Sequence, residues 1–303
     1  MNHGHEYRKH LGGDVSGVNV IDYLCRHYSQ CTRAEWLDRI RSGRVLLDGI
    51  PSGPDAILRP GGNLSWLRPP WEEPDVPRSF AILYRDEHLL GVAKPRGLPT
   101  VPGGGSFMEN TLLALVRQNF PGASPLHRLG RGTSGIVLFA VNPEAASKMS
   151  QAWRRGKVLK VYLALVSGCP ASDEFIIDAP IGPIPHRILK TIYAACHTGK
   201  PAHSHVHVLE RRDNCSLCQV RITTGRPHQI RIHLAAAGHP LVGDPLYIAG
   251  GVPADDSSAL PSDMGYQLHS ALLGFSHPNN GKWIEIGCAP PPPLRRLATN
   301  LNE

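Results

Sequence analysis

The sequence lacks any long apolar run. No stretch of about 18 apolar residues occurs in its 303 residues, so a transmembrane helix is not expected. Residues 1–14 are polar and rich in histidine, without the apolar core that a secretory signal requires. We therefore expect a polar N-terminal tail and a cytoplasmic protein that makes no contact with a membrane.

Paired cysteines and clustered metal ligands are also scarce. The seven cysteines are odd in number and scattered, which is typical of reduced thiols rather than of a disulfide framework. His203, His205 and His207 alternate as on one face of a strand, and one Cys215-x-x-Cys218 pair follows. A structural zinc site usually needs a second such pair. We expect no metal.

Acidic residues are outnumbered by basic ones. The chain has 32 Lys and Arg against 25 Asp and Glu, which gives a net charge of +7. A basic excess favours polyanionic partners, because the bound polyanion releases its counterions. A soluble protein without such a partner can carry the same charge, so composition alone leaves both interpretations open.

The first part of the chain has the pattern of a small basic module. Apolar residues recur at helical spacing over residues 18–28 and 32–42, and Thr32 is a suitable N-cap. A short strand over 44–48 then turns at Asp48-Gly49. The module spans residues 15–68 and carries an excess of arginines: Arg26, Arg33, Arg39, Arg41 and Arg44. An ordinary solvated helix face accounts for them equally well.

A chain of this length has room for one large core beside such a module. Dense prolines within residues 69–79 predict a linker, and four consecutive prolines at 290–293 close the second domain, 80–293, before a tail over 294–303. Strands predominate and helices are placed irregularly, which predicts an α+β fold with a mixed sheet. The expected strands cover 80–84, 89–93, 135–141, 158–166 and 215–222, and the expected helices 111–120 and 143–153.

Two segments carry residues suited to ligand binding. Residues 127–135 read His-Arg-Leu-Gly-Arg-Gly-Thr-Ser-Gly and lead into an apolar strand. Such a loop can bring backbone N–H groups and guanidinium groups to a phosphate or a nucleobase, although it can also be a basic turn without a ligand. In the second segment, Pro227 suits the first turn of a helix and Gly238 its end, which would place His228, Arg231 and Ala235 on one face.

Together these segments resemble the RluA-type pseudouridine synthases, whose hallmark is a His-Arg-Leu-Asp loop ending in Thr-Ser-Gly. The similarity continues in family order through further blocks at residues 94–99, 160–166, 199–202, 225–247, 268–270 and 274–278. It implies a mainly antiparallel mixed sheet of the pseudouridine synthase type. The N-terminal module resembles, more weakly, the small basic RNA-binding domain that often precedes this catalytic domain. The expected partner is RNA, and the expected state is a monomer.

The resemblance implies isomerisation of uridine in ribosomal or transfer RNA, without a cofactor. The glycosidic bond is cut, the uracil rotates, and it is rejoined through carbon after the base has left its stack. By this resemblance Tyr162 contacts the flipped uracil, Arg231 pairs with the catalytic carboxylate, and Arg128 holds the displaced nucleotide. The other expected RNA-contacting residues are Arg131, Thr133, Arg226, His228, Gln229, Arg33, Arg39 and Arg41.

The sequence departs from the family pattern at the residue that carries the chemistry. Gly130 occupies the position of the essential aspartate, and no acidic residue occurs from 110 to 143. Carboxylates are the usual groups that stabilise or capture the charge on a sugar carbon. Arg231 is therefore expected to be hydrated or to hold an anion, unless Asp244 or Asp86 reaches it. Two interpretations stay open: a synthase with a rearranged site, and a catalytically silent RNA-binding protein.

Overall fold

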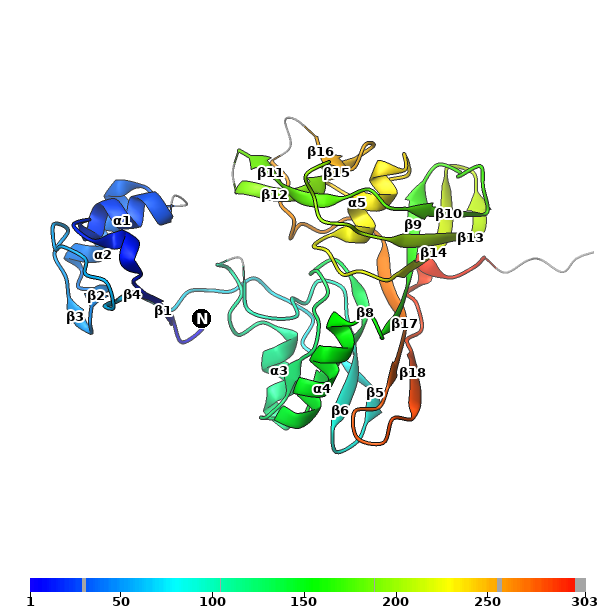
Figure 1. The fold of residues 1–303 in the computed structure, drawn as a ribbon, viewed down its shortest axis with the longest axis horizontal. Coiled ribbons are helices and arrows are strands. Elements are labelled where there is room, and N and C mark those ends of the chain that lie inside the picture. Colours follow the sequence, from blue (N-terminus) through cyan, green and yellow to red (C-terminus); the bar gives the residue numbers. More distant parts are fainter. Residues whose placement is uncertain (29–30, 104, 188, 255–257, 298–303) are drawn as a thin grey trace, which may run out of the picture. The chain divides into compact units, whose positions relative to one another are not determined.

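A computed structural model describes residues 1–28, 31–103, 105–187, 189–254 and 258–297 (Figure 1). The chain divides into two compact units, Met1–Glu73 and Pro74–Glu303. Residues 69–79, where we predicted a linker, form no helix or strand. The predicted tail over 294–303 begins with buried Leu294 in the 3₁₀ helix η2 (Pro292–Leu294), and residues 298–303 lie outside the described part of the chain.

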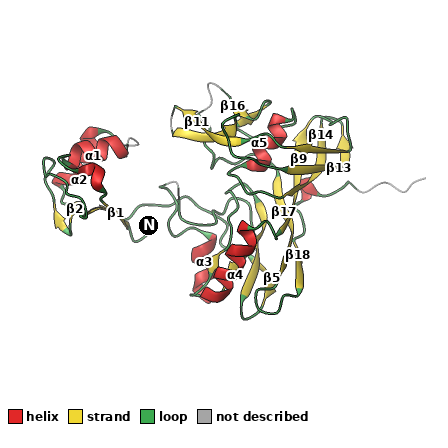
Figure 2. Cartoon of the chain, in the orientation of Figure 1, coloured by secondary structure: helices red, strands yellow, loops and turns green. Residues whose placement is uncertain are grey.

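The first unit combines two helices with a small antiparallel sheet (Figure 2). Its strands are ordered β1-β4-β2-β3. Along the chain, the elements are β1 (His5–His10), the 3₁₀ helix η1 (Gly13–Val15), α1 (Val20–His27), α2 (Arg33–Arg41), β2 (Val45–Leu47), β3 (Ile50–Pro51) and β4 (Asn63–Arg68). The prediction of an N-terminal tail was wrong, because β1 pairs with β4 from His5 to His10. The strand is mostly exposed, so it lacks the apolar alternation that would have predicted it.

Local sequence determines the ends of these elements. The Thr32 hydroxyl accepts from the Glu35 N–H, and the Glu35 carboxylate accepts from the Thr32 N–H, so α2 begins with a capping box. This confirms the predicted N-cap. Asp48 and Gly49 adopt positive φ angles of 50° and 85° between β2 and β3, as a two-residue hairpin turn requires.

The second unit is built on one large mixed sheet, which is mainly antiparallel as predicted. Its longest path runs β10-β13-β14-β9-β17-β8-β6-β5, with β18 beside β17 and β7 beside β8. The strands are β5 (Ala81–Arg85), β6 (Leu89–Lys94), β7 (Ser124–Pro125), β8 (Ser134–Ala140), β9 (Leu159–Ser167), β10 (Glu174–Ile177), β13 (Ser204–Arg212), β14 (Cys215–Ile222), β17 (Leu268–Ser276) and β18 (Trp283–Gly287). Two small ribbons pair β11 (Ile181–His186) with β12 (Lys190–Ala195), and β15 (Tyr247–Ile248) with β16 (Val252–Pro253).

Helices cover both faces of this sheet. Leu112 of α3 (Leu112–Asn119) shares a buried cluster with Val137 of β8, whereas Met149 of α4 (Pro143–Arg154) shares another with Ile136. Adjacent strand residues point to opposite faces, so the two helices lie on opposite sides of the sheet. Ile230 of α5 (Gln229–Ala236) belongs to the same cluster as α3, and α5 lies beside the β9–β14 end of the sheet (Figure 1).

The two halves of the large sheet meet at one short joint. β17 and β8 pair in parallel through only two residue pairs, one of which joins Ser270 to Gly135. Gly135 has a φ of 109°, and a Cβ atom there would lie 2.2 Å from the Ser270 carbonyl oxygen. Only glycine allows so close an approach of two backbones. Ser270 also pairs with Tyr162 of β9, so the loop over residues 127–135 enters the sheet beside Tyr162.

Candidate active site

The 127–135 loop is fixed to the core at its start. The Leu129 side chain is buried, and its backbone N–H and C=O both bond to the Thr100 hydroxyl, at 3.1 and 2.8 Å. His127 stacks on Trp153 and accepts a hydrogen bond from the Leu138 N–H through Nε2. The backbone before Gly130 is therefore held by the protein itself.

A buried lysine fixes the next part of the loop. Lys94 Nζ donates to the carbonyl oxygens of Leu98 (2.7 Å) and Arg131 (3.4 Å), and burial lowers the pKa of this ammonium to about 7. Arg131 Nε donates to the Gly97 carbonyl, and its guanidinium lies over the Phe107 ring. Arg131, which we expected to contact RNA, is thus bonded to the protein. The role of Lys94 as a brace was not predicted.

Arg231 pairs with Asp244, one of the two carboxylates considered as alternatives to water or a bound anion. Its Nε and one terminal nitrogen each donate to an Asp244 carboxylate oxygen at 2.7 Å, and the other terminal nitrogen donates to the Pro261 carbonyl at 2.8 Å. The two side chains are only 3% and 1% exposed. The guanidinium lies between the rings of Tyr247 and Tyr266, 4.9 and 4.3 Å from their centroids. This buried cation is fully compensated.

The Asp244 carboxylate also makes two hydrogen bonds to the backbone. One carboxylate oxygen accepts from the backbone N–H groups of Leu246 and Tyr247, at 2.9 and 3.1 Å. A carboxylate that already accepts four hydrogen bonds is not available to attack a sugar carbon. Asp244 therefore neutralises the charge of Arg231, and its hydrogen bonds leave it no role as a nucleophile.

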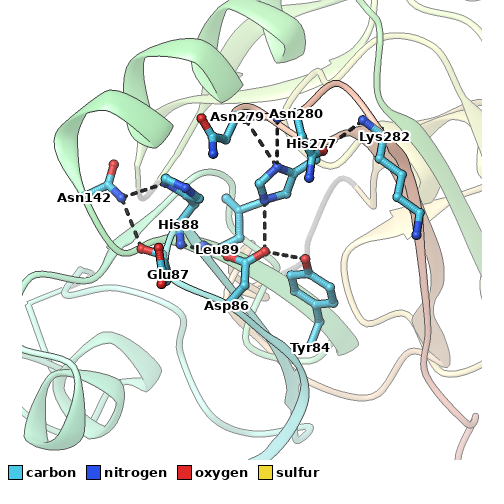
Figure 3. Close-up of polar contacts among 10 residues, drawn as sticks. All are labelled: Tyr84, Asp86, Glu87, His88, Leu89, Asn142, His277, Asn279, Asn280 and Lys282. Atoms are coloured by element: carbon cyan, nitrogen blue, oxygen red, sulfur yellow. Dashed lines mark hydrogen bonds and ion pairs between the residues drawn. The ribbon is translucent and has the colours of Figure 1, made fainter.

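Asp86, the other carboxylate considered, serves a different cluster (Figure 3). It accepts from the Tyr84 hydroxyl, from His277 Nε2 at 2.9 Å and from the backbone N–H groups of His88 and Leu89 at 2.7 Å. Burial raises the pKa of Tyr84 to about 12. These contacts tie the β5–β6 turn to the segment after β17, so we interpret Asp86 as structural.

Tyr266 fills the space beside Gly130. Gly130 does not have a positive φ, but a Cβ atom there would lie 2.9 Å from the Tyr266 hydroxyl oxygen, and one at Gly132 would lie 2.8 Å from Cζ of the same ring. The hydroxyl is 3.3 Å from Thr133 Oγ1. The Tyr266 ring therefore lies between the loop and Arg231, where side chains at 130 and 132 would otherwise project. Sequence analysis missed this residue, because it lies outside the recognised blocks.

A cleft of about 680 Å³ borders this region. Its lining includes Lys94, Gly132, Ser134, Tyr266 and His269. Tyr266 thus separates the cleft from the buried ion pair, and Thr133, which we expected to contact RNA, is buried beside it.

Tyr162 and His228 lie in the same region of the unit. Tyr162 is 8% exposed and shares a buried cluster with Leu129 and Tyr266. Burial raises the pKa of the Tyr162 phenol to about 12, although a hydrogen bond with Ser270 opposes the shift. His228 Nδ1 lies 2.8 Å from the Tyr247 hydroxyl. Burial, with the charge of Arg231, lowers the pKa of His228 to about 4, so this imidazole is neutral.

The helix that carries Arg231 begins later than predicted. α5 starts at Gln229, and its N-cap His228 has a φ of 54°, so Pro227 lies outside the helix. Gln229 accepts from the Thr224 hydroxyl and the Arg226 N–H, and it donates to the His203 carbonyl. The predicted stop is confirmed, because Gly238 follows the helix with a φ of 86°.

These bonds reduce the set of side chains that can bind RNA. The Gln229 amide is buried and used within the fold, and Arg226 Nε donates to the Pro201 carbonyl. Arg128 differs, because it is exposed and no other residue in the described ranges hydrogen-bonds or ion-pairs with its guanidinium. Its charge contributes to the low pKa of His228, so it lies near the Arg231 region.

The arginines of the first unit are partly neutralised. Arg33 pairs with Asp22 at 2.7 Å, and exposed Arg41 lies 4.0 Å from Asp38. Arg39 lies over the rings of Trp36 and Trp66, 4.6 and 4.4 Å from their centroids, and it bonds to Cys31 Sγ. Cation–π packing of this kind stabilises the fold as well as presenting charge.

The histidine strand does not gather a ligand set. His205 and His203 are exposed, and His207 lies 3.1 Å from Glu174. Within the described residues, no group of three or more His, Cys, Asp or Glu side chains is arranged to hold a metal ion. No helix among the described residues is long and apolar enough to cross a membrane.

Comparison with known proteins identifies the family. Residues 88–236 match the family model described as RNA pseudouridylate synthase. A protein of Synechocystis sp., named an uncharacterized RNA pseudouridine synthase, is 41% identical over 91% of this chain and 95% of its own length. The chain belongs to the RNA pseudouridine synthase family. Members of this family isomerise uridine in RNA, and this chain is accordingly an isomerase.

Other relatives support membership of the RluA type. The dual-specificity RNA pseudouridine synthase RluA of Salmonella typhimurium is 34% identical over 67% of this chain and 89% of its own. The ribosomal large subunit pseudouridine synthase D of Pseudomonas aeruginosa is 34% identical over 89% and 88%. The solved structure of human RNA pseudouridylate synthase domain containing 1 has a TM-score of 0.58 at 27% identity, covering 74% of this chain and 89% of that one. The synthase fold is thus shown by sequence and by structure.

Proposed function

We propose that this pseudouridine synthase acts on ribosomal or transfer RNA at the site formed by the 127–135 loop, Tyr162 and Arg231. The observation that carries the proposal is the buried, bidentate Arg231–Asp244 pair behind that loop. It keeps the cation of the family pattern in place although Gly130 stands where the family has its aspartate. The printed names of the relatives, which include a ribosomal large subunit synthase, support the choice of RNA.

The residues around the pair have distinct proposed roles. Exposed Arg128 binds phosphate of the displaced nucleotide, because a guanidinium with no protein partner among the described residues is free to do so. Tyr162, at the joint of the sheet, contacts the flipped uracil. In the first unit, Arg33, Arg39 and Arg41 add sequence-independent attraction for RNA. Arg131, Thr133, Arg226 and Gln229 bond within the fold and hold this site in shape.

The relatives do not support a catalytically silent RNA-binding protein, because they are named as synthases. We further propose that the protein works as a monomer in the cytoplasm. All seven cysteines are free thiols, as is usual in a reducing compartment.

The proposed function is tested by tritium release from RNA that contains 5-tritiated uridine. Loss of the C5 proton accompanies formation of the new carbon–carbon bond, so the wild type should release tritium from bulk ribosomal or transfer RNA. Tyr162→Ala should release far less while still binding RNA. A wild-type protein that binds these RNAs tightly and releases no tritium from any of them would contradict the proposal.

A further inference from the structure

We propose that Tyr266 is a catalytic residue and that its phenolic oxygen takes the place of the carboxylate that Gly130 cannot supply. The inference rests on the function proposed above and identifies the reacting group of that site. Its starting point is a steric fact: the Tyr266 hydroxyl oxygen lies 2.9 Å from the Cβ position of residue 130. A carboxylate carried by residue 130 would occupy this same space.

The surroundings of the hydroxyl match those of a reactive oxygen. The Arg231 guanidinium carbon lies 4.3 Å from the centroid of the Tyr266 ring, so a positive charge, which is also paired with Asp244, adjoins the phenol. The hydrogen-bonding partner of the hydroxyl is Thr133 Oγ1 at 3.3 Å, a longer contact than strong O–H···O bonds show. The phenol is therefore placed next to a cation but only weakly bonded to the protein.

The loop beside the hydroxyl makes access possible. Tyr266 is 2% exposed, and the backbone of Gly130 and Gly132 covers its hydroxyl edge. A ribose in the cleft that Tyr266 and Gly132 line can reach the oxygen only if the Gly130–Gly132 backbone moves aside when RNA binds, which also breaks the bonds that hold Arg131 to Lys94 and Gly97. Two glycines leave no side chains to displace, whereas the fixed Leu129 keeps the start of the loop in place.

Tyrosine can act as a nucleophile toward a sugar carbon. In the first step the phenolic oxygen forms a bond to C1′ as the C1′–N1 bond breaks, and the phenol proton passes to the departing uracil. The uracil then rotates, and C5 attacks C1′ as the C1′–O bond to Tyr266 breaks. The C5 proton finally returns to the phenolate, so no other reactant is consumed. The adjacent Arg231 guanidinium stabilises the phenolate.

The experiment compares three variants in the tritium-release assay, alongside RNA binding and thermal unfolding. Tyr266→Phe removes only the hydroxyl and should lower kcat by roughly 10³-fold, with RNA affinity unchanged. Tyr84→Phe is the matched control, because it removes a phenolic hydroxyl from the structural Asp86 cluster. It should retain wild-type kcat.

The decisive variant is Gly130→Asp/Tyr266→Phe. Apart from the Tyr266 hydroxyl, the nearest atom to a Cβ at residue 130 is Thr133 Oγ1 at 3.7 Å, so removal of the hydroxyl relieves the close contact of the new Cβ. Its kcat should be at least about tenfold higher than that of Tyr266→Phe. If the kcat of Tyr266→Phe is within about tenfold of the wild-type value, Tyr266 is not the reacting group, and the proposed function stays intact. A folded, RNA-binding double variant no more active than Tyr266→Phe overturns it as well. An inactive wild type refutes the proposed function instead.

Discussion

Replacing Asp244 with asparagine should strongly destabilise the second unit. Asn keeps the size of the side chain and one acceptor oxygen, but its amide N–H₂ group would face the Arg231 guanidinium, which only donates. The guanidinium would then be a buried cation with half of its bidentate partner removed. Breaking a buried ion pair on one side costs about 3–5 kcal/mol, a large part of the roughly 5–15 kcal/mol that stabilises a typical domain.

Urea unfolding gives the measurement. The midpoint should fall while the dependence of the unfolding free energy on urea stays constant, because the surface exposed on unfolding is unchanged. Asp173→Asn is the matched control: Asp173 pairs with Arg211 at 2.6 Å in the same unit, but its side chain is 74% exposed. An exposed pair of this kind contributes about 0–1 kcal/mol.

Two outcomes would refute this reasoning. The first is an Asp244→Asn variant that loses no more stability than Asp173→Asn. The second is an Arg231→Met/Asp244→Leu variant that is less stable than Asp244→Asn alone. Removing both charges should relieve the unpaired cation, so the double replacement is expected to be the more stable of the two.

Three further predictions concern the loop, the RNA and the pH. Gly130→Ala should lower the free energy of unfolding by about 1–3 kcal/mol because the new methyl group crowds the Tyr266 hydroxyl, and the loss should be clearly smaller in a Tyr266→Phe background. A double-mutant cycle by urea unfolding measures this, with Gly287→Ala, whose Cβ meets no atom within 4 Å, as the control. Arg128→Ala should weaken RNA binding and reduce the slope of log K against log salt by about 0.7–0.9 in a titration series, whereas Lys148→Ala, in an ion pair on α4, should leave that slope nearly unchanged. Stability should fall as pH drops from 6.5 toward 4, because the folded state keeps the pKa of His228 near 4 while the unfolded chain binds the proton. His228→Asn, which tolerates the left-handed backbone, should remove part of that dependence.

The sequence predicted what local patterns determine. Apolar patterns located α3, α4 and the strands β5, β6, β8, β9 and β14, but β10, β17 and β18 were not among the expected strands. The cap at Thr32 followed from residues three apart. β1 escaped prediction because its side chains are mostly exposed and carry no alternation. Its pairing with β4 depends on residues more than fifty positions away.

The chemistry of the site could be predicted only in part. Arg231 was recognised as a central cation, but its bond to Asp244 depends on the turn that follows α5, and residue spacing gives no measure of that turn. Gln229 looked like a ligand, yet an amide serves equally well to satisfy backbone groups. Tyr266 lies in a segment without regular structure. Its position against Gly130 and Gly132 depends on the fold and cannot be predicted from residue spacing.

The contact between Gly135 and Ser270 fixes the end of the 127–135 loop at the joint between β8 and β17. One end of the loop is fixed by backbone bonds at Leu129 and the other by a backbone crossing that excludes even a methyl group. Between these two anchors, a side chain added at Gly130 or Gly132 would meet the Tyr266 side chain rather than backbone. A side chain at Gly135 would instead meet the Ser270 backbone and force β8 away from β17. An added carbon at residue 130 therefore affects one side chain, whereas an added carbon at residue 135 disrupts the strand pairing that joins the two halves of the sheet.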